Sequence, residues 1–251
     1  MTISRNNSPL LWTENITKSY NGRIIIEDVK VELKKGELVS LVGASGGGKT
    51  TLFNAIAGLT LPDRGQVYLE SQDITGSPGR ISYMLQKDML LRHKKIIDNV
   101  SLPLILRGVK KKEAREQASP LFEEFGLEGT QDLYPVQLSG GMRQRAALLR
   151  TYLSSRGIVL LDEPFSALDS ITRKAMHRWY LDVMRKIGLS TLFITHDIDE
   201  AITLSDRIYV LSGKPGKIRE EMVLPDRAGR PENFDLTEEF LNIKKQILSC
   251  L

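Results

Sequence analysis

The sequence predicts an α/β fold with a mixed β-sheet, antiparallel strands near the N-terminus and an inserted α-helical subdomain. Two nearly continuous apolar runs, residues 38–42 and 157–161, are typical of parallel strands that are buried on both faces. Strand-like and helix-like patterns alternate along most of the chain, which indicates an α/β core. Residues 88–152 interrupt this alternation, because they contain little strand-like pattern.

The remaining elements of the core follow from hydrophobic periodicity. Residues 12–17 and 65–69 alternate between polar and apolar side chains, as half-buried strands do. A glycine-rich turn follows the strand at 38–42, and we expect a helix to start near Lys49. Shorter apolar segments predict three more strands, at residues 81–85, 192–195 and 207–211.

The helical subdomain is expected to contain one break. Ala114, Leu121, Phe122 and Phe125 share one helical face. Pro120 lies inside this pattern and has no backbone N–H to donate, so we expect the helix to kink or stop there.

We expect the chain to have three parts. Residues 1–87 and 153–224 form the α/β core, and residues 88–152 form the helical subdomain. Residues 225–251 form a short tail, in which a polar stretch precedes an amphipathic helix at 237–251.

The composition is that of an ordinary globular protein. Of the 251 residues, 41% are hydrophobic and 26% are charged, which is enough for a substantial core. No apolar run is long enough to span a bilayer, and residues 1–8 lack the apolar stretch of a secretory signal. Cys250 is the single cysteine, so no internal disulfide can form, which fits a reducing compartment. We therefore expect a cytosolic location.

The charge pattern does not favour a nucleic-acid partner. The formal net charge is +4, and the densest basic runs are residues 92–95 and 110–112. Neither run is interleaved with aromatic side chains, as a groove for single strands would be. We interpret both runs as solvated surface and expect no nucleic-acid partner.

A phosphate-binding motif follows the strand at 38–42. Its residues are Gly43, Ala44, Ser45, Gly46, Gly47, Gly48, Lys49 and Thr50, followed by Thr51. In a turn between a strand and a helix, backbone N–H groups and the helix N-terminus attract phosphate oxygens. Lys49 would place its charge on the β- and γ-phosphates, and the Thr50 hydroxyl would ligate Mg²⁺. A glycine-rich turn without a ligand is the alternative, and it leaves this strand–turn–helix context unexplained.

A buried carboxylate is expected at the end of the strand at 157–161. Asp162 follows this strand, where a charge needs a partner. Mg²⁺, reached directly or through water, is the natural partner because hard cations prefer oxygen ligands.

Three further motifs narrow the class of nucleotide-binding protein. They are Leu-Ser-Gly-Gly-Met at residues 138–142, Leu-Leu-Asp-Glu-Pro at 160–164 and Thr-His-Asp at 195–197. In this order after the phosphate-binding motif, they resemble the ATPase subunit of ATP-binding cassette (ABC) transporters. The resemblance covers nearly the whole chain, from about Leu11 to about Leu224.

This resemblance implies roles for four side chains in ATP hydrolysis. Glu163 would polarise the attacking water as general base, and Gln86 would reach Mg²⁺ and this water. His196 would contact the γ-phosphate, and Tyr20 would stack on adenine. The alternatives are a capping or ion-pair role for Glu163, a structural role for His196 and a place in the core for Tyr20.

The same resemblance implies a head-to-tail dimer with two composite ATP sites, formed with a second copy or with a paralogous ATPase. Ser139, Gly140 and Gly141 would cap a helix of the projecting subdomain and contact the γ-phosphate held by the partner subunit. Asp169 ends the Ser-Ala-Leu-Asp loop at 166–169, which would cross the dimer seam.

The leading hypothesis is the ATP-hydrolysing subunit of a bacterial-type ABC importer. It would drive uptake of a small anion or heterocycle through separate integral membrane permease subunits, with a substrate-binding protein as an indirect partner. We expect it to be peripheral, on the cytoplasmic face of the membrane. Residues 162–169 and 195–201 are typical of importers, and residues 211–218 are similar to the nitrate/sulfonate/taurine group.

Two alternatives from other classes fit less of the sequence. A non-transport ABC ATPase acting on nucleic acid or the ribosome usually carries coiled-coil insertions, zinc-binding cysteines or tandem cassettes. A GTPase or small-molecule kinase leaves residues 138–142 unexplained, and the chain lacks an Asn-Lys-x-Asp guanine-binding motif.

The segment after Gln86 is a candidate contact with the permease. Residues 89–91 and 102–106 carry more apolar surface than one short helix needs. The resemblance implies that residues 89–91 help to line a groove for a cytoplasmic helix of the permease. The alternative is that they pack in the core of the helical subdomain.

Overall fold

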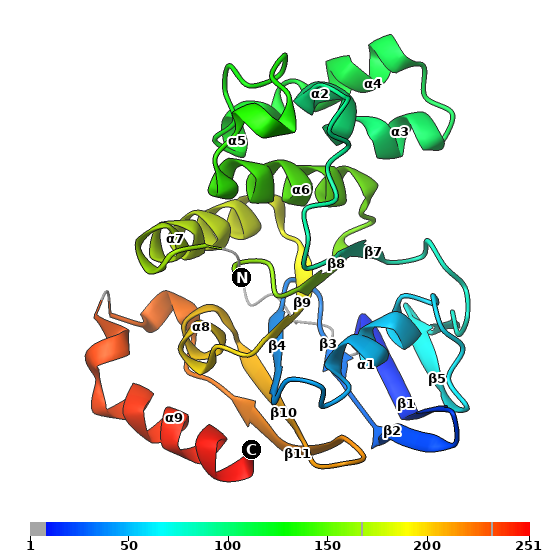
Figure 1. Ribbon diagram of the computed structural model, residues 1–251. Coiled ribbons are helices and arrows are strands. Elements are labelled where there is room, and N and C mark those ends of the chain that lie inside the picture. Colours follow the sequence, from blue (N-terminus) through cyan, green and yellow to red (C-terminus); the bar gives the residue numbers. More distant parts are fainter. Residues whose placement is uncertain (1–8, 167, 232) are drawn as a thin grey trace, which may run out of the picture. The chain divides into compact units, whose positions relative to one another are not determined.

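The computed structural model describes residues 9–166, 168–231 and 233–251 (Figure 1). The chain divides into two compact units, one of Met1–Ile81 with Leu189–Leu251 and one of Ser82–Gly188. The expected helical segment at 88–152 lies within the second unit, and its limits as a functional subdomain stay a prediction. Two sequence predictions fall partly or wholly outside the described residues. They are the lack of a secretory signal at residues 1–8 and the Ser-Ala-Leu-Asp loop at 166–169, which contains Ala167.

The N-terminal strands of the first unit form an antiparallel sheet around β1. Strand β1 (Leu11–Tyr20) pairs with β2 (Arg23–Val29), β3 (Glu32–Leu33) and β5 (Arg64–Leu69), and β5 pairs with β6 (Gln72–Asp73). Asn21 and Gly22 join β1 to β2 with φ angles of 52° and 74°. Positive φ at both central residues is what a two-residue hairpin turn requires. The antiparallel strands expected near the N-terminus are confirmed.

The buried strands of the first unit are parallel. Strand β4 (Leu38–Gly43) lies between β9 (Ser190–Thr195) and β10 (Arg207–Ser212) and is parallel to both. Every residue of β4 and β9 is buried, which explains their continuous apolar pattern. Strand β11 (Lys217–Val223) is antiparallel to β10, so the sheet is mixed, as predicted.

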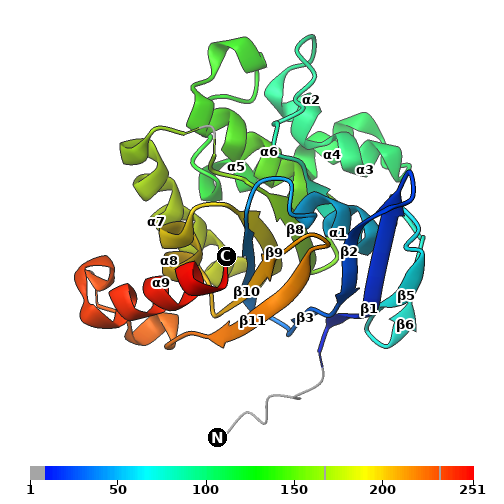
Figure 2. The same ribbon diagram turned by 60° about the horizontal axis from the view of Figure 1, so that its bottom comes forward.

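The described residues of the first unit form three α-helices: α1 (Lys49–Ile56), α8 (Ile198–Leu204) and α9 (Glu238–Cys250). Two short 3₁₀ turns, η2 (Arg227–Gly229) and η3 (Phe234–Leu236), precede α9. Helices α8 and α9 share one hydrophobic cluster with strands β4, β10 and β11 (Figure 2). The tail helix expected at 237–251 is therefore present, and its apolar face packs on the core.

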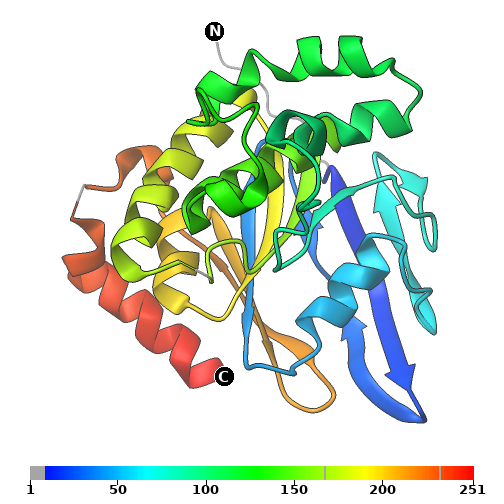
Figure 3. The ribbon, with the colours of Figure 1, turned by 45° about the horizontal axis from the view of Figure 1, so that its top comes forward.

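The second unit combines two parallel strands with six α-helices in its described residues. Strand β7 (Ser82–Met84) is parallel to β8 (Ile158–Asp162). The helices, which Figure 3 shows together, are α2 (Ile96–Val100), α3 (Leu102–Leu106), α4 (Lys111–Ala118), α5 (Leu121–Glu124), α6 (Gly140–Ser154) and α7 (Ser170–Ile187), with a 3₁₀ turn η1 (Pro135–Gln137).

The predicted helix break falls at Pro120. Helix α4 ends at Ala118, and α5 begins directly after Pro120. Ala114, Phe122 and Phe125 are fully buried, as the predicted apolar face requires, whereas Leu121 is only partly buried. Among the described residues, no helix has the length and apolar character needed to cross a membrane.

Candidate functional site

The phosphate-binding motif forms a tight loop between β4 and α1. Gly48 has a φ of 98°, and a Cβ at this position would lie 2.4 Å from Cγ2 of Ile26. A Cβ on Gly43 would lie 2.3 Å from the carbonyl oxygen of Leu211. The first glycine of the motif and the last one therefore fit only without a side chain.

Lys49 points back into this loop. Its ammonium donates to the carbonyl of Gly43 at 2.7 Å and to the carbonyl of Ala44 at 2.9 Å, and the residue is only 6% exposed. Ala44, Ser45 and Gly46 of the loop are exposed, and so is Thr50 in the first turn of α1. A buried lysine ammonium at an exposed glycine-rich loop that leads into a helix N-terminus is an arrangement suited to binding phosphate.

His196 comes to the same edge of the sheet as this loop. Val42 of β4 pairs with Thr195 of β9, so His196 leaves β9 where the loop leaves β4. The ring is exposed, and the next residue, Asp197, accepts a hydrogen bond from the N–H of Glu200 at 3.1 Å and caps α8. The sheet register thus explains why His196 of the Thr-His-Asp motif emerges at the same sheet edge as the loop.

Tyr20 ends β1 and is 44% exposed, so it does not pack in the core. The Lys18 ammonium lies 5.5 Å from the centre of its ring. Asp63 fixes this end of β1, because its carboxylate accepts from Lys18 Nζ at 2.8 Å and from Ser19 N at 2.6 Å. The bonds from Lys18 and Ser19 lower the pKa of Asp63 to about 2. Contact between Tyr20 and adenine stays a prediction.

In the second unit, Gln86 and Glu163 meet at the ends of paired strands. Met84 of β7 pairs with Leu161 of β8, so the residues that follow both strands emerge together. The Gln86 amide donates to Oε2 of Glu163 at 2.9 Å. The sequence predicted both residues as catalytic candidates, and the register explains why they are in contact.

Asp162 is 7% exposed and has a partner that sequence reasoning missed. The Tyr83 hydroxyl donates to Oδ2 of Asp162 at 3.2 Å. Burial and the nearby Asp162 charge raise the pKa of Tyr83 above its ordinary value, so the phenol keeps its proton at neutral pH. The available signal was a tyrosine in the short strand predicted at residues 81–85.

Ser139 and Asp169 are both helix N-caps. The Ser139 hydroxyl accepts from the N–H of Met142 at 3.3 Å at the start of α6. The Asp169 carboxylate accepts from the N–H groups of Ile171 and Thr172 at the start of α7, and these bonds lower its pKa. Both side chains are exposed at the positive end of a helix.

Gly140 and Gly141 bring these two helix starts together. A Cβ on Gly141 would lie 3.4 Å from Thr172 Cγ2, and one on Gly140 would lie 3.8 Å from Leu168 Cδ2. The Ser-Gly-Gly motif therefore lies beside the Asp169 loop within the second unit. Whether either contacts a nucleotide on a partner subunit stays a prediction.

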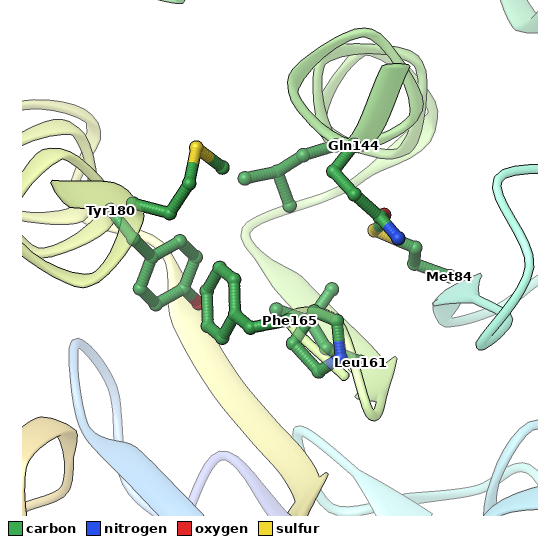
Figure 4. A pocket seen from close by; sticks show the side chains of 8 residues that line it. Met84, Gln144, Leu161, Phe165 and Tyr180 are labelled. Atoms are coloured by element: carbon green, nitrogen blue, oxygen red, sulfur yellow. The ribbon is translucent and has the colours of Figure 1, made fainter. Parts of the chain in front are cut away.

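A small cavity lies behind the turn that follows Glu163. Figure 4 shows Gln144 of α6, Tyr180 of α7 and Phe165 around it. Its lining residues are Met84, Gln144, Leu148, Leu161, Pro164, Phe165, Met176 and Tyr180. Because this lining is mostly apolar and contains no cation, the cavity is unsuited to a phosphate group.

The segment after Gln86 divides into buried and exposed side chains. Leu90 is only 7% exposed and belongs to the core, whereas Met89 is 57% exposed. Arg150 of α6 donates to the carbonyls of Asp88 and Met89 at 2.5 and 2.8 Å. For Leu90, the core-packing alternative is therefore correct.

Comparison with known proteins identifies the family. A family model described as ABC transporter matches residues 26–166. The chain is 41% identical over 245 residues to the formylaminopyrimidine import ATP-binding protein ThiZ of Halalkalibacterium halodurans, a match that covers 96% of each chain. It is 37% identical over 234 residues to the nitrate import ATP-binding protein NrtD of a Synechocystis species, which covers 91% of this chain and 88% of the relative.

A solved structure gives the same result. The dimeric post-hydrolysis state of the ATP-binding cassette MJ0796, bound to ADP and Pi, matches with a TM-score of 0.74 and 30% identity. The match covers 86% of this chain and 99% of that one. The chain belongs to the ABC transporter family and is an ABC transporter ATPase, so the family and the fold predicted from its motifs are confirmed.

Proposed function

We propose that this chain hydrolyses Mg²⁺-bound ATP and that Glu163 is the general base. The observation that carries this proposal is the 2.9 Å hydrogen bond from Gln86 to the Glu163 carboxylate. This bond orients the carboxylate that would accept a proton from water. A base must be held within hydrogen-bond reach of the proton that it removes.

The residues of the phosphate loop bind the nucleotide in this proposal. N–H groups from Gly43 to Thr51 and the N-terminus of α1 surround the phosphates, and Lys49 neutralises their charge. His196, at the same sheet edge, donates to the γ-phosphate. Tyr20 stacks on adenine.

The chemistry of three side chains fits Mg²⁺. The Thr50 hydroxyl, the Asp162 carboxylate and the Gln86 amide all offer oxygen, the donor that this cation prefers. When bound, Mg²⁺ neutralises charge that develops on the phosphate oxygens. The Tyr83 hydroxyl donates to Oδ2 of Asp162 and so helps to orient this carboxylate.

The proposed active form is a head-to-tail dimer, formed with a second copy or a paralogous ATPase. The Ser139 hydroxyl accepts one bond at the start of α6 and still carries a proton that it can donate to a partner's γ-phosphate. Gly141 adds its backbone N–H, and Asp169 lies beside this motif. The dimeric ADP-bound and Pi-bound cassette supports this assembly.

We further propose an importer subunit that is peripheral, on the cytoplasmic face of the membrane. Two relatives are named for import of a formylaminopyrimidine and of nitrate, which supports a heterocycle or a small anion as cargo. Membrane permease subunits and a substrate-binding protein would select it. Co-purification with a permease supports this assignment, whereas co-purification with ribosomes or nucleic acid favours a non-transport ABC ATPase.

The substitution Glu163→Gln tests the catalytic assignment. It keeps the size of the side chain but removes the base, so we expect normal ATP binding and single-turnover hydrolysis about 10²–10⁴-fold slower. Glu128→Gln, at an exposed position of the same unit, is the matched control. Hydrolysis by Glu163→Gln within a fewfold of the control would assign the general base to another group.

A further inference from the structure

The turn that joins β10 to β11 contacts the phosphate loop. Sequence reasoning used residues 211–218 only as a family resemblance, and no role was assigned to them. In the first unit, Gly216 of this turn lies directly behind Gly47, and a Cβ on Gly216 would lie 2.3 Å from the Gly47 carbonyl oxygen. Figure 1 shows the β10–β11 turn beside the loop between β4 and α1.

Gly216 is required for space and not for its backbone conformation. Fourteen glycines with positive φ are found among the described residues, and Gly216 is not one of them. An alanine at 216 could therefore adopt the same φ, but its Cβ would collide with backbone. A separation of 2.3 Å is far below the ordinary carbon–oxygen contact, and the Gly47 carbonyl is not the end of a flexible side chain.

Backbone hydrogen bonds hold Gly216 in this position. Its N–H donates to the carbonyl of Ile25 at 2.8 Å, and its carbonyl accepts from the N–H of Glu27 at 3.0 Å. Strand β2 lies against Gly48, the residue after Gly47. A Cβ on Gly48 would be only 2.4 Å from Cγ2 of Ile26 in this strand. An ion pair between Lys217 and Glu27, at 2.8 Å, ties the same two segments together. Gly216 and β2 thus form one wall behind Gly47 and Gly48.

We propose that Gly216 is a positioning residue for ATP, acting through Gly47. The β10–β11 turn fixes the position of the Gly47–Gly48 backbone, and the Gly47 N–H donates to the carbonyl of Ala44 at 3.1 Å, so the turn helps to set the shape of the loop that binds the phosphates. This inference rests on the proposed role of the loop in binding ATP phosphates. In this proposal the β10–β11 turn supports the loop and does not itself contact ATP.

The test compares Gly216→Ala with Gly229→Ala. Gly229 lies in the same unit, lacks a positive φ, and has no atom within 4 Å of a Cβ, so it controls for the added methyl group. Because a displacement of about 1 Å in a binding loop has large effects, we expect Gly216→Ala to bind ATP about 10- to 100-fold more weakly by calorimetry. We expect its circular dichroism, and its melting temperature without nucleotide, to stay close to those of Gly229→Ala.

The outcomes separate this inference from the proposed function. A wild-type protein that does not bind ATP would refute the function of the loop. A wild-type protein that binds ATP, with Gly216→Ala equal to Gly229→Ala, would overturn only the positioning role. Equal affinity per folded molecule with a lower melting temperature would also overturn it, because the contact would then serve stability alone.

Hydrogen exchange on the wild-type protein decides the matter if Gly216→Ala does not fold. Coupling between two sites is reciprocal, so an ATP-ordered loop must stabilise the turn that supports it. We expect ATP to slow exchange of the Gly216 and Glu27 amides, and to leave unchanged the Gly229 amide, which donates to Asp226 at 3.0 Å. Unchanged exchange at Gly216 and Glu27 would overturn the proposal.

Discussion

At the scale of single residues, Glu163 is held in an unusual conformation. Its φ is 47°, in the left-handed region that non-glycine residues rarely adopt. The Glu163 carbonyl accepts from the N–H of Ser166 at 3.2 Å and from the Ser166 hydroxyl at 3.0 Å, while its carboxylate accepts from Gln86. Strain of this kind persists only where the surroundings determine the conformation. The backbone and the side chain are both anchored, so the direction of the carboxylate is determined.

Tyr20 gives the residue-scale prediction for nucleotide recognition. Its ring is exposed at the end of β1, where a purine could stack on it. Stacking of a base on an aromatic ring is worth about 1–3 kcal/mol, so Tyr20→Ala should weaken ATP binding about 5- to 150-fold. Tyr20→Phe keeps the ring and should bind like wild type, and GTP should be accepted to some degree. Equal affinity in the alanine and phenylalanine variants would place adenine elsewhere.

At the scale of elements, helix α6 anchors the segment that follows Gln86. Arg150 donates to the carbonyls of Asp88 and Met89, and Arg143 forms an ion pair with the Asp88 carboxylate at 3.3 Å. Arg143 also donates to the carbonyl of Leu138, at the start of the Leu-Ser-Gly-Gly motif. A shift of the backbone at Gln86 would therefore displace α6, because charge-assisted bonds from Arg143 and Arg150 connect this helix to the segment at Asp88.

This anchored segment carries the prediction for permease binding. Met89 is exposed with a φ of 48°, whereas Leu90 beside it is buried. Met89→Asp should therefore reduce co-purification with a permease while the basal ATPase of the isolated subunit is unchanged. Val223→Asp, at an apolar residue of the other unit that is 80% exposed, is the control. Normal assembly and transport by Met89→Asp would place the contact elsewhere, and Leu90→Asp should disrupt folding.

At the scale of the whole molecule, the predicted site residues are divided between the two units. The phosphate loop, His196 and Tyr20 belong to the first unit. Gln86, Glu163 and the Ser-Gly-Gly motif at 139–141 belong to the second. ATP hydrolysis that requires site residues of the first unit and of the second unit depends on how units and subunits assemble. Mixed dimers test this requirement directly.

Mixed dimers of two inactive variants test the composite site. Lys49→Ala removes the phosphate-binding cation of the first unit, and Ser139→Arg blocks the start of α6 in the second. In a head-to-tail heterodimer both changes fall in one of the two ATP sites, so the other site should restore partial hydrolysis. Dimers purified through two different tags provide the measurement, and doubly tagged Lys49→Ala dimers are the control. A heterodimer as inactive as its parents would contradict independent shared sites.

Local patterns in the sequence were sufficient to predict many of the elements and the family. The apolar runs at 38–42 and 157–161 became β4 and β8, Pro120 separated α4 from α5, and the family was confirmed. These features depend on residues close together in the chain, where the period of hydrophobic side chains and the geometry of proline act directly.

Only the tertiary structure decided which distant residues support one another. The register of β4 with β9 brought His196 to the phosphate loop, and that of β7 with β8 brought Gln86 to Glu163. The burial of Leu90 beside the exposed Met89, and the approach of Gly216 to Gly47, also had no local signal. Strand pairing and close backbone contact depend on residues far apart in the chain, and no pattern within one segment reports on them.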